Sequence, residues 1–70
     1  MEFQEKAKIR MEHWLSHSEH HITEYGHFAE EMENAGLKTS AGHLREMIAL
    51  MVKGNDCLRE ALSALSAKHE

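Results

Sequence analysis

The sequence predicts an all-α fold, an antiparallel two-helix hairpin that dimerises into a four-helix bundle. Three observations lead to this prediction. The 70 residues contain no proline, apolar residues recur at alternating spacings of four and three along two long segments, and a short glycine-containing segment separates them. We therefore expect a single domain over residues 1–70, with a helix over 2–35, a turn over 36–40 and a second helix over 41–68.

The first helix is predicted by an apolar seam that continues for about seven turns. Trp14, His21 and Phe28 recur every seven residues along one flank of this seam, which is the spacing of two helical turns. The seam itself consists of Met11, Leu15, Ser18, Ile22, Tyr25, Ala29, Met32 and Gly36.

The turn is predicted by the segment Asn34-Ala35-Gly36-Leu37. Glycine adopts the left-handed conformation that commonly ends a helix, and Leu37 would then fold back on the last turn. Thr39 or Ser40 offers a side-chain oxygen to cap the next helix. Because the connection is short, the two helices should be antiparallel neighbours.

The second helix has a seam with the same spacing, interrupted by one amide. Asn55 either fixes the register or the oligomeric state as a buried polar residue, or marks a hydrated position beside Gly54, which weakens the helix locally. Gly54 and Ala61 on the flank would allow another helix to approach closely. The seam consists of Leu44, Ile48, Met51, Asn55, Leu58, Leu62 and Leu65.

A lone hairpin of this kind is marginally stable, because two helices bury only one seam. Pairing two hairpins would cover both flanks, and a two-fold dimer is the commonest way to do so. We therefore expect a homodimer. The large apolar residues that a single hairpin would leave poorly covered are Trp14, Phe28, Met47, Leu50 and Val52.

Composition and charge exclude several classes of function. The net charge is −4 with neutral histidines and +3 with all seven protonated (−4 + 7), which disfavours nucleic acid as the main partner at neutral pH. No apolar run approaches the ~20 residues of a membrane span. The single Cys57 excludes an internal disulfide and suits a reducing cytoplasm. Phosphate-binding loops, nucleophile elbows and zinc-protease motifs are missing, so we expect a binding protein and not an enzyme.

Five of the seven histidines lie in the segment HWLSHSEHHITEYGH, residues 13–27. At about 100° per residue, four of them and one glutamate fall within about 80° of one another on the face turned away from the seam. His21 lies between this stripe and the flank of the seam. The six candidate metal ligands are His13, His17, His20, His21, Glu24 and His27.

Neutral imidazole is a preferred ligand of zinc, nickel and copper. Histidines four residues apart on a helix can chelate one ion, and His13/His17 and His17/His21 have that spacing. One helix face rarely supplies more than two or three ligands, so water, a second chain or a client metalloprotein must supply the rest. We therefore expect nickel or zinc, held for storage, delivery or sensing.

Other interpretations remain open. The histidines could be incidental surface residues of a structural oligomerisation or protein-interaction module, and their titration could act as a pH switch. Glu24 and His27 match the Glu-x-x-His motif of di-iron bundles, with Glu46 or Glu60 as further carboxylates. Glu24 and His27, however, lie on the outward stripe, whereas such a motif has to point inward. Cys57 is either a packing residue or a soft ligand.

The segment from His13 to His21, followed by Tyr25, Ala29, Gly36-Leu37 and a Leu/Ala-rich second helix, resembles a small His-rich two-helix domain. That domain opens with HW-x2-H-x3-H and is associated with nickel-binding accessory proteins of carbon monoxide dehydrogenase and hydrogenase maturation. The resemblance covers roughly residues 8–65. It implies that His13, His17 and His21 are the matching ligands, that His20 and His27 are additional, and that the protein handles or senses metal. The mid-helix Gly26 departs from the pattern and predicts a bend.

Overall fold

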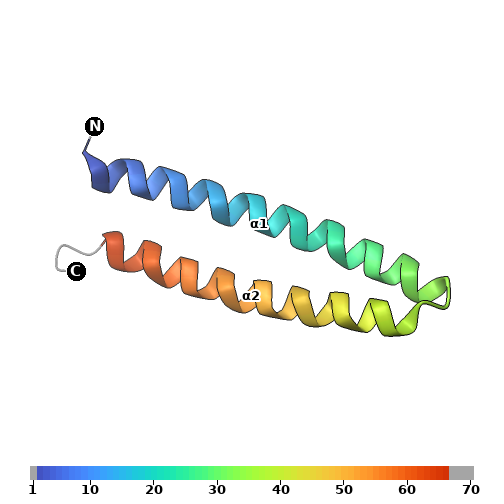
Figure 1. Ribbon diagram of the computed structural model, residues 1–70. Helices are drawn as coiled ribbons and strands as arrows, with labels where there is room; N and C mark the ends of the chain where they lie inside the picture. Colours follow the sequence, from blue (N-terminus) through green and yellow to red (C-terminus); the bar gives the residue numbers. More distant parts are fainter. Residues whose placement is uncertain (1, 67–70) are drawn as a thin grey trace.

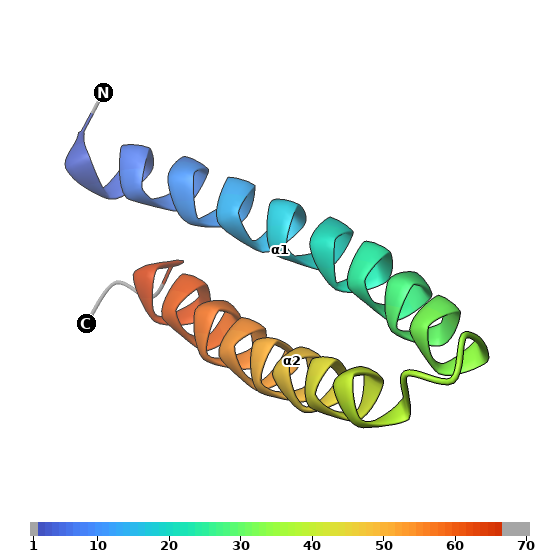
Figure 2. The same ribbon diagram turned by 45° about the vertical axis from the view of Figure 1, so that its right-hand side comes forward.

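A computed structural model describes residues 2–66 and shows two long helices joined by a tight turn. Helix α1 spans Phe3–Asn34 and helix α2 spans Lys38–Ser66. The helices run antiparallel, with the start of α1 and the end of α2 at one end of the hairpin and the turn at the other (Figure 1). The turned view shows the same side-by-side arrangement (Figure 2). The all-α hairpin is thus confirmed. The expected end of the second helix at Lys68 lies outside the described residues.

The turn is a Schellman motif built on Gly36. The φ angle of Gly36 is +86°, a left-handed conformation that favours glycine. The amide of Leu37 donates to the carbonyl of Met32 at 2.9 Å, and the amide of Gly36 donates to the carbonyl of Glu33 at 3.0 Å. These two bonds satisfy carbonyls that the end of α1 leaves free. The prediction that Gly36 ends the first helix is confirmed.

The start of the second helix was predicted three residues too late. Thr39 and Ser40 lie inside the first turn of α2, which begins at Lys38, so neither is the capping residue. The amide of Ala41 donates to the carbonyl of Leu37 at 3.0 Å. The chain therefore enters α2 directly after the Schellman turn, and the loop is shorter than expected. Helix α1 continues without a break through Gly26.

The contact between the helices consists of the two predicted seams. The Cα trace measures 51 × 19 × 11 Å, so the molecule is a single layer of two helices. In such a layer only small residues become fully covered, and Ala29 and Ala41 are the two fully buried apolar residues of the described chain. The other apolar seam residues are partly exposed.

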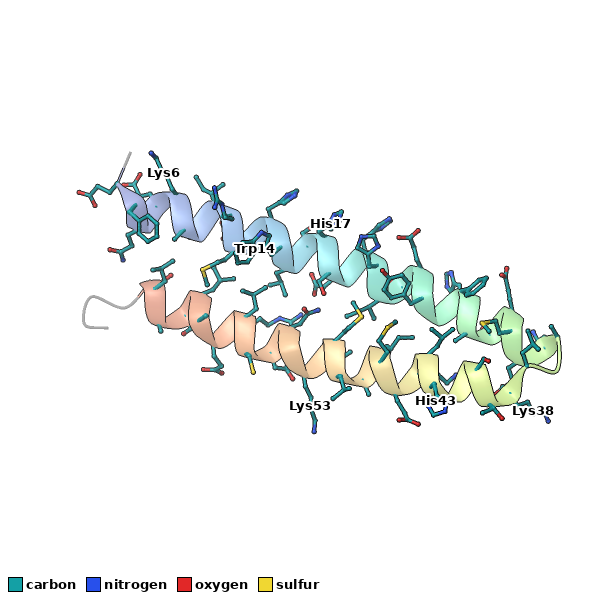
Figure 3. All side chains as sticks on the ribbon, viewed as in Figure 1. Lys6, Trp14, His17, Lys38, His43 and Lys53 are labelled. Carbon is teal, nitrogen blue, oxygen red and sulfur yellow. The ribbon has the colours of Figure 1, made fainter. Side chains whose placement is uncertain are left out.

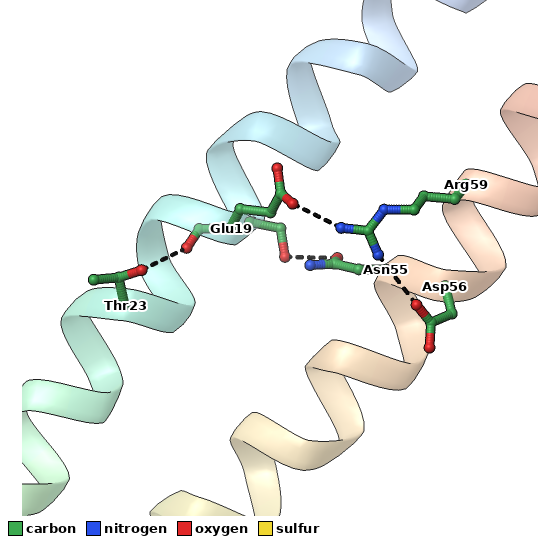
Figure 4. Close-up of polar contacts among 6 residues, drawn as sticks. Glu19, Thr23, Asn55, Asp56 and Arg59 are labelled. Carbon is green, nitrogen blue, oxygen red and sulfur yellow. Dashed lines mark hydrogen bonds and ion pairs between the residues drawn. The ribbon is translucent and has the colours of Figure 1, made fainter.

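Asn55 is the one buried polar residue within the described chain, with 6% of its surface exposed. The hydroxyl of Ser18 donates to Oδ1 of Asn55 at 2.8 Å (Figure 4). Because this bond joins the two helices near their midpoints, it fixes their register. Of the two interpretations of Asn55, the structure supports a buried residue that sets register.

Two ion pairs cross between the helices along one broad side of the hairpin. Arg59 pairs with Glu19 at 2.7 Å and also contacts Asp56 at 3.1 Å (Figure 4). Nearer the turn, Arg45 pairs with Glu33. The hydrogen bond from Arg45 and its positive charge lower the pKa of Glu33, and the hydrogen bond to Glu33 and its negative charge raise the pKa of Arg45. We call this side the polar face.

The opposite broad side is largely apolar, and we call it the apolar face. The five residues predicted to be poorly covered are all exposed, as are Phe3, Ile9 and Leu37. Val52 lies seven residues before Arg59 and therefore belongs to the polar face. The apolar face consists of Phe3, Trp14, His21 and Phe28 from α1 and Met47, Leu50, Gly54 and Ala61 from α2.

Candidate metal site

The histidine cluster, by which we mean the six candidate ligands between His13 and His27, lies in the middle of α1. It extends from the outer edge of the helix to the border of the apolar face. Figure 3 shows Trp14 on the side of α1 toward α2 and His17 on the edge away from it. This placement follows from the helical period, because residues four apart are shifted by only about 40° around the axis. The cluster is therefore accessible from outside the hairpin.

Two imidazoles of the cluster converge on a single point. Nε2 of His17 lies 2.9 Å from Nε2 of His21, and the two rings meet edge to face with their centroids 4.4 Å apart. Such an approach has two physical explanations. Either one Nε2 carries a proton and donates it to the other, or both lone pairs point at a shared cation.

Glu24 favours one tautomer of His21. Its Oε1 lies 3.1 Å from Nδ1 of His21, so a proton on Nδ1 would be hydrogen-bonded to a carboxylate. A histidine that donates from Nδ1 carries its lone pair on Nε2, the atom that faces His17. A carboxylate behind the ring is the usual arrangement for a metal-ligating histidine, because it fixes the ring and raises its basicity.

The surroundings of His21 hold its ring in place on the other side. The ring stacks on that of Tyr25, with centroids 5.5 Å apart and an interplanar angle of 15°. Its side chain is 35% exposed, whereas that of His20 is 74% exposed. The prediction that His21 lies between the stripe and the core is confirmed by this partial burial. His21 is thus held in one orientation and is only partly buried.

The remaining candidate ligands are less well connected. His13 stacks beside His17 with ring centroids 5.8 Å apart, and Nε2 of His20 lies 3.6 Å from Glu24. Among the hydrogen bonds and ring contacts of residues 2–66, none joins His27 to the cluster. In the same residues, no group of three or more His, Cys, Asp or Glu side chains is arranged to hold a metal ion. The structure therefore brings together His17, His21 and Glu24 out of the six candidates.

Other functional candidates lie apart from this cluster. Glu24 is 55% exposed and Glu46 is 74% exposed, so neither carboxylate is inside the contact between the helices where a di-metal bundle would need it. Cys57 is an exposed free thiol on α2. No helix within residues 2–66 is long and apolar enough to cross a membrane.

The fold and the cluster together define a small helical hairpin with a histidine-rich edge. A family profile described as a domain of unknown function, DUF8180, matches residues 7–65. The chain belongs to this family. No curated protein and no solved structure matches it. The family description names no activity, so the resemblance to nickel accessory proteins stays a prediction.

Proposed function

We propose that this protein binds a transition metal ion, nickel or zinc, through His17 and His21, with Glu24 orienting His21. The observation that carries the proposal is the 2.9 Å separation of the two Nε2 atoms. Bonds of about 2.0–2.1 Å at a right angle place two ligand nitrogens about 2.9 Å apart, and at a tetrahedral angle about 3.4 Å apart. The pair therefore needs little rearrangement to chelate one ion.

The proposed site is open, because two imidazoles occupy only part of a coordination sphere. His13 lies one turn away and could become a third ligand, and water or a second protein would supply the others. In a single chain, such an exposed and partly coordinated ion would exchange more readily than one enclosed by four protein ligands. The arrangement suits a protein that delivers, stores or senses metal in the cytoplasm, where the exposed thiol of Cys57 would stay reduced.

Calorimetric titration of the metal-free protein with nickel and with zinc tests the proposal. We expect micromolar or tighter binding that is lost in His17→Ala/His21→Ala. Binding should be kept in His27→Ala, the matched control, which replaces another histidine on the same helix. Glu24→Gln should weaken binding roughly 10- to 100-fold, the usual effect of removing the group that orients a ligand. Absence of heat, or equal heat in the double variant, would exclude these histidines as the site.

A second candidate function is a helical interaction module that pairs with its own copy or with a metalloprotein client. The exposed apolar face favours it, because large contiguous apolar surfaces on small proteins mark interaction sites. Light scattering of the metal-free protein at micromolar concentration should then give about twice the chain mass of 8.0 kDa. A mass of one chain would exclude self-association and leave a different protein as the partner of this face.

A further inference from the structure

The hairpin exposes more surface than a protein of its mass ordinarily does. Its accessible surface is 5545 Å², whereas a folded monomer of 8.0 kDa is expected to expose about 4,450 Å². The excess is about 1,100 Å², and a stable dimer of standard size covers about 800 Å² on each partner. The uncovered surface is therefore sufficient for one protein–protein interface.

The apolar face has a symmetric layout around its centre. Trp14 and Phe28 lie seven residues before and after His21, and Met47 and Ala61 lie seven residues before and after Gly54. His21 and Gly54 are at about the same level of the hairpin, because the Ser18–Asn55 bond joins the turns beside them. A two-fold axis through this level would place each outer residue against the opposite outer residue of a second copy.

Gly54 lies on the apolar face, where its missing side chain is compatible with a neighbouring chain. A glycine inside a helix costs about 1 kcal/mol relative to alanine, yet a Cβ added at Gly54 would meet no atom within 4 Å. The hairpin itself therefore gives no packing reason for glycine at this position. At an interface, the missing side chain lets another helix approach closely.

Charges on α1 are arranged in the same symmetric way. Arg10 lies eleven residues before His21 and Glu31 lies ten residues after it, so antiparallel α1 helices centred near His21 bring opposite charges together. The hollow lined by Phe3, Ala7, Met11 and Trp14, with Lys6 and Arg10 at its rim, would then have its Trp14 end opposite Phe28 of the second copy. The positions of these apolar and charged residues are therefore compatible with pairing to a second copy of the same face.

We propose that two copies pack antiparallel through their apolar faces, around an axis near His21 and Gly54, and share one metal ion held by His17 and His21 of both chains. The proposal rests on the proposed function, because the shared ion uses the same ligands. It explains how a site with two imidazoles per chain becomes complete, since two pairs supply the four ligands of a closed site. If the axis instead ran along the hairpin, α1 would face α2 and the two histidine pairs would be separated.

Native mass spectrometry and sedimentation of the protein loaded with nickel or zinc distinguish these arrangements. We expect a dimer with one ion per two chains, and His21→Ala should lose the ion. One ion per chain, on a monomer or on a dimer, would overturn the shared site and leave metal binding by His17 and His21 intact. A protein that binds no ion would overturn the proposed function as well. The stoichiometry thus separates the two failures.

A matched pair of glycine substitutions tests the interface. Gly54→Gln should convert the dimer to monomer and leave the helical circular dichroism unchanged, because the space beside Gly54 is open within one chain. Gly26→Gln fills a similarly open position on α1 outside the apolar face, and should remain dimeric. If both variants have the same mass in solution, the apolar face is not the interface.

Disulfide trapping gives a readout that does not depend on metal. In a Cys57→Ala background, His21→Cys places a thiol beside the proposed axis, and mild oxidation should link two chains. Lys53→Cys in the same background, on the exposed side of α2, is the control and should stay unlinked. Equal cross-linking of the two variants would overturn the proposed position of the axis.

Discussion

Removing the hydroxyl of Ser18 should destabilise the hairpin although alanine is the better helix former. In Ser18→Ala, Asn55 keeps its buried position and loses its partner at 2.8 Å. A buried polar group left unsatisfied costs about 1–3 kcal/mol, and the gain in helix propensity offsets up to about 0.5 kcal/mol. We therefore expect a net loss of about 1–2 kcal/mol, which for a domain of this size lowers Tm by roughly 5–15 °C.

Urea unfolding followed by circular dichroism measures this loss. All variants must be compared at one protein concentration, because association would add to the apparent stability. Ser16→Ala is the matched control, since Ser16 is exposed on the same helix, and it should be neutral or slightly stabilising. Ser18→Ala/Asn55→Leu should recover the lost stability, because both polar groups are then replaced by apolar ones.

Equal stability of Ser18→Ala and Ser16→Ala would refute this prediction. In that case water would replace the hydroxyl at no cost, and Asn55 would occupy a hydrated position. A single variant could mislead through a change in packing. Comparing the double variant with both single variants removes this ambiguity, because effects that are independent at the two sites cancel and only their coupling remains.

Three further outcomes follow from the turn and the polar face. Gly36→Ala should cost about 1–2 kcal/mol in urea unfolding, because alanine is strained at a φ of +86°. Gly26→Ala should instead stabilise the fold by about 0.5–1 kcal/mol, since Gly26 is helical and the space beside it is open. NMR titration of the Glu33 carboxyl should give a pKa below its ordinary value of 4.5, and Arg45→Gln should return it toward that value. Because the folded pKa is lowered, the pair stabilises the fold above the unfolded pKa and loses this effect as the pH falls through the folded one.

Much of the fold could be predicted because one pattern determines it. The four-and-three spacing identified the seam even where the residue was polar, and Ser18 and Asn55 proved to be partners across it. The start of α2 could not be predicted in the same way. Thr39 and Ser40 are good capping residues, but the Schellman bonds of Gly36 and Leu37 close the turn so tightly that the helix begins before them.

The candidate site was only partly predictable, because a helical projection treats each side chain as a radial direction. It placed His21 correctly at the border of the cluster and the core. The convergence of His17 and His21 depends on rotamers and on the hydrogen bond to Glu24, which a projection does not contain. The i, i+4 spacing of the two histidines was the available signal, but it was shared by His13 and His17.

The two broad sides of the hairpin differ in a way that limits how far association can proceed. Glu19 with Arg59 and Glu33 with Arg45 neutralise one another within the chain on the polar face, and their charged groups would have to lose water if another hairpin covered them. Apolar association is therefore favourable on one side of the layer only. A surface that pairs with its own copy is fully covered once two chains have met, so the proposed dimer would be a closed pair that does not extend into a filament.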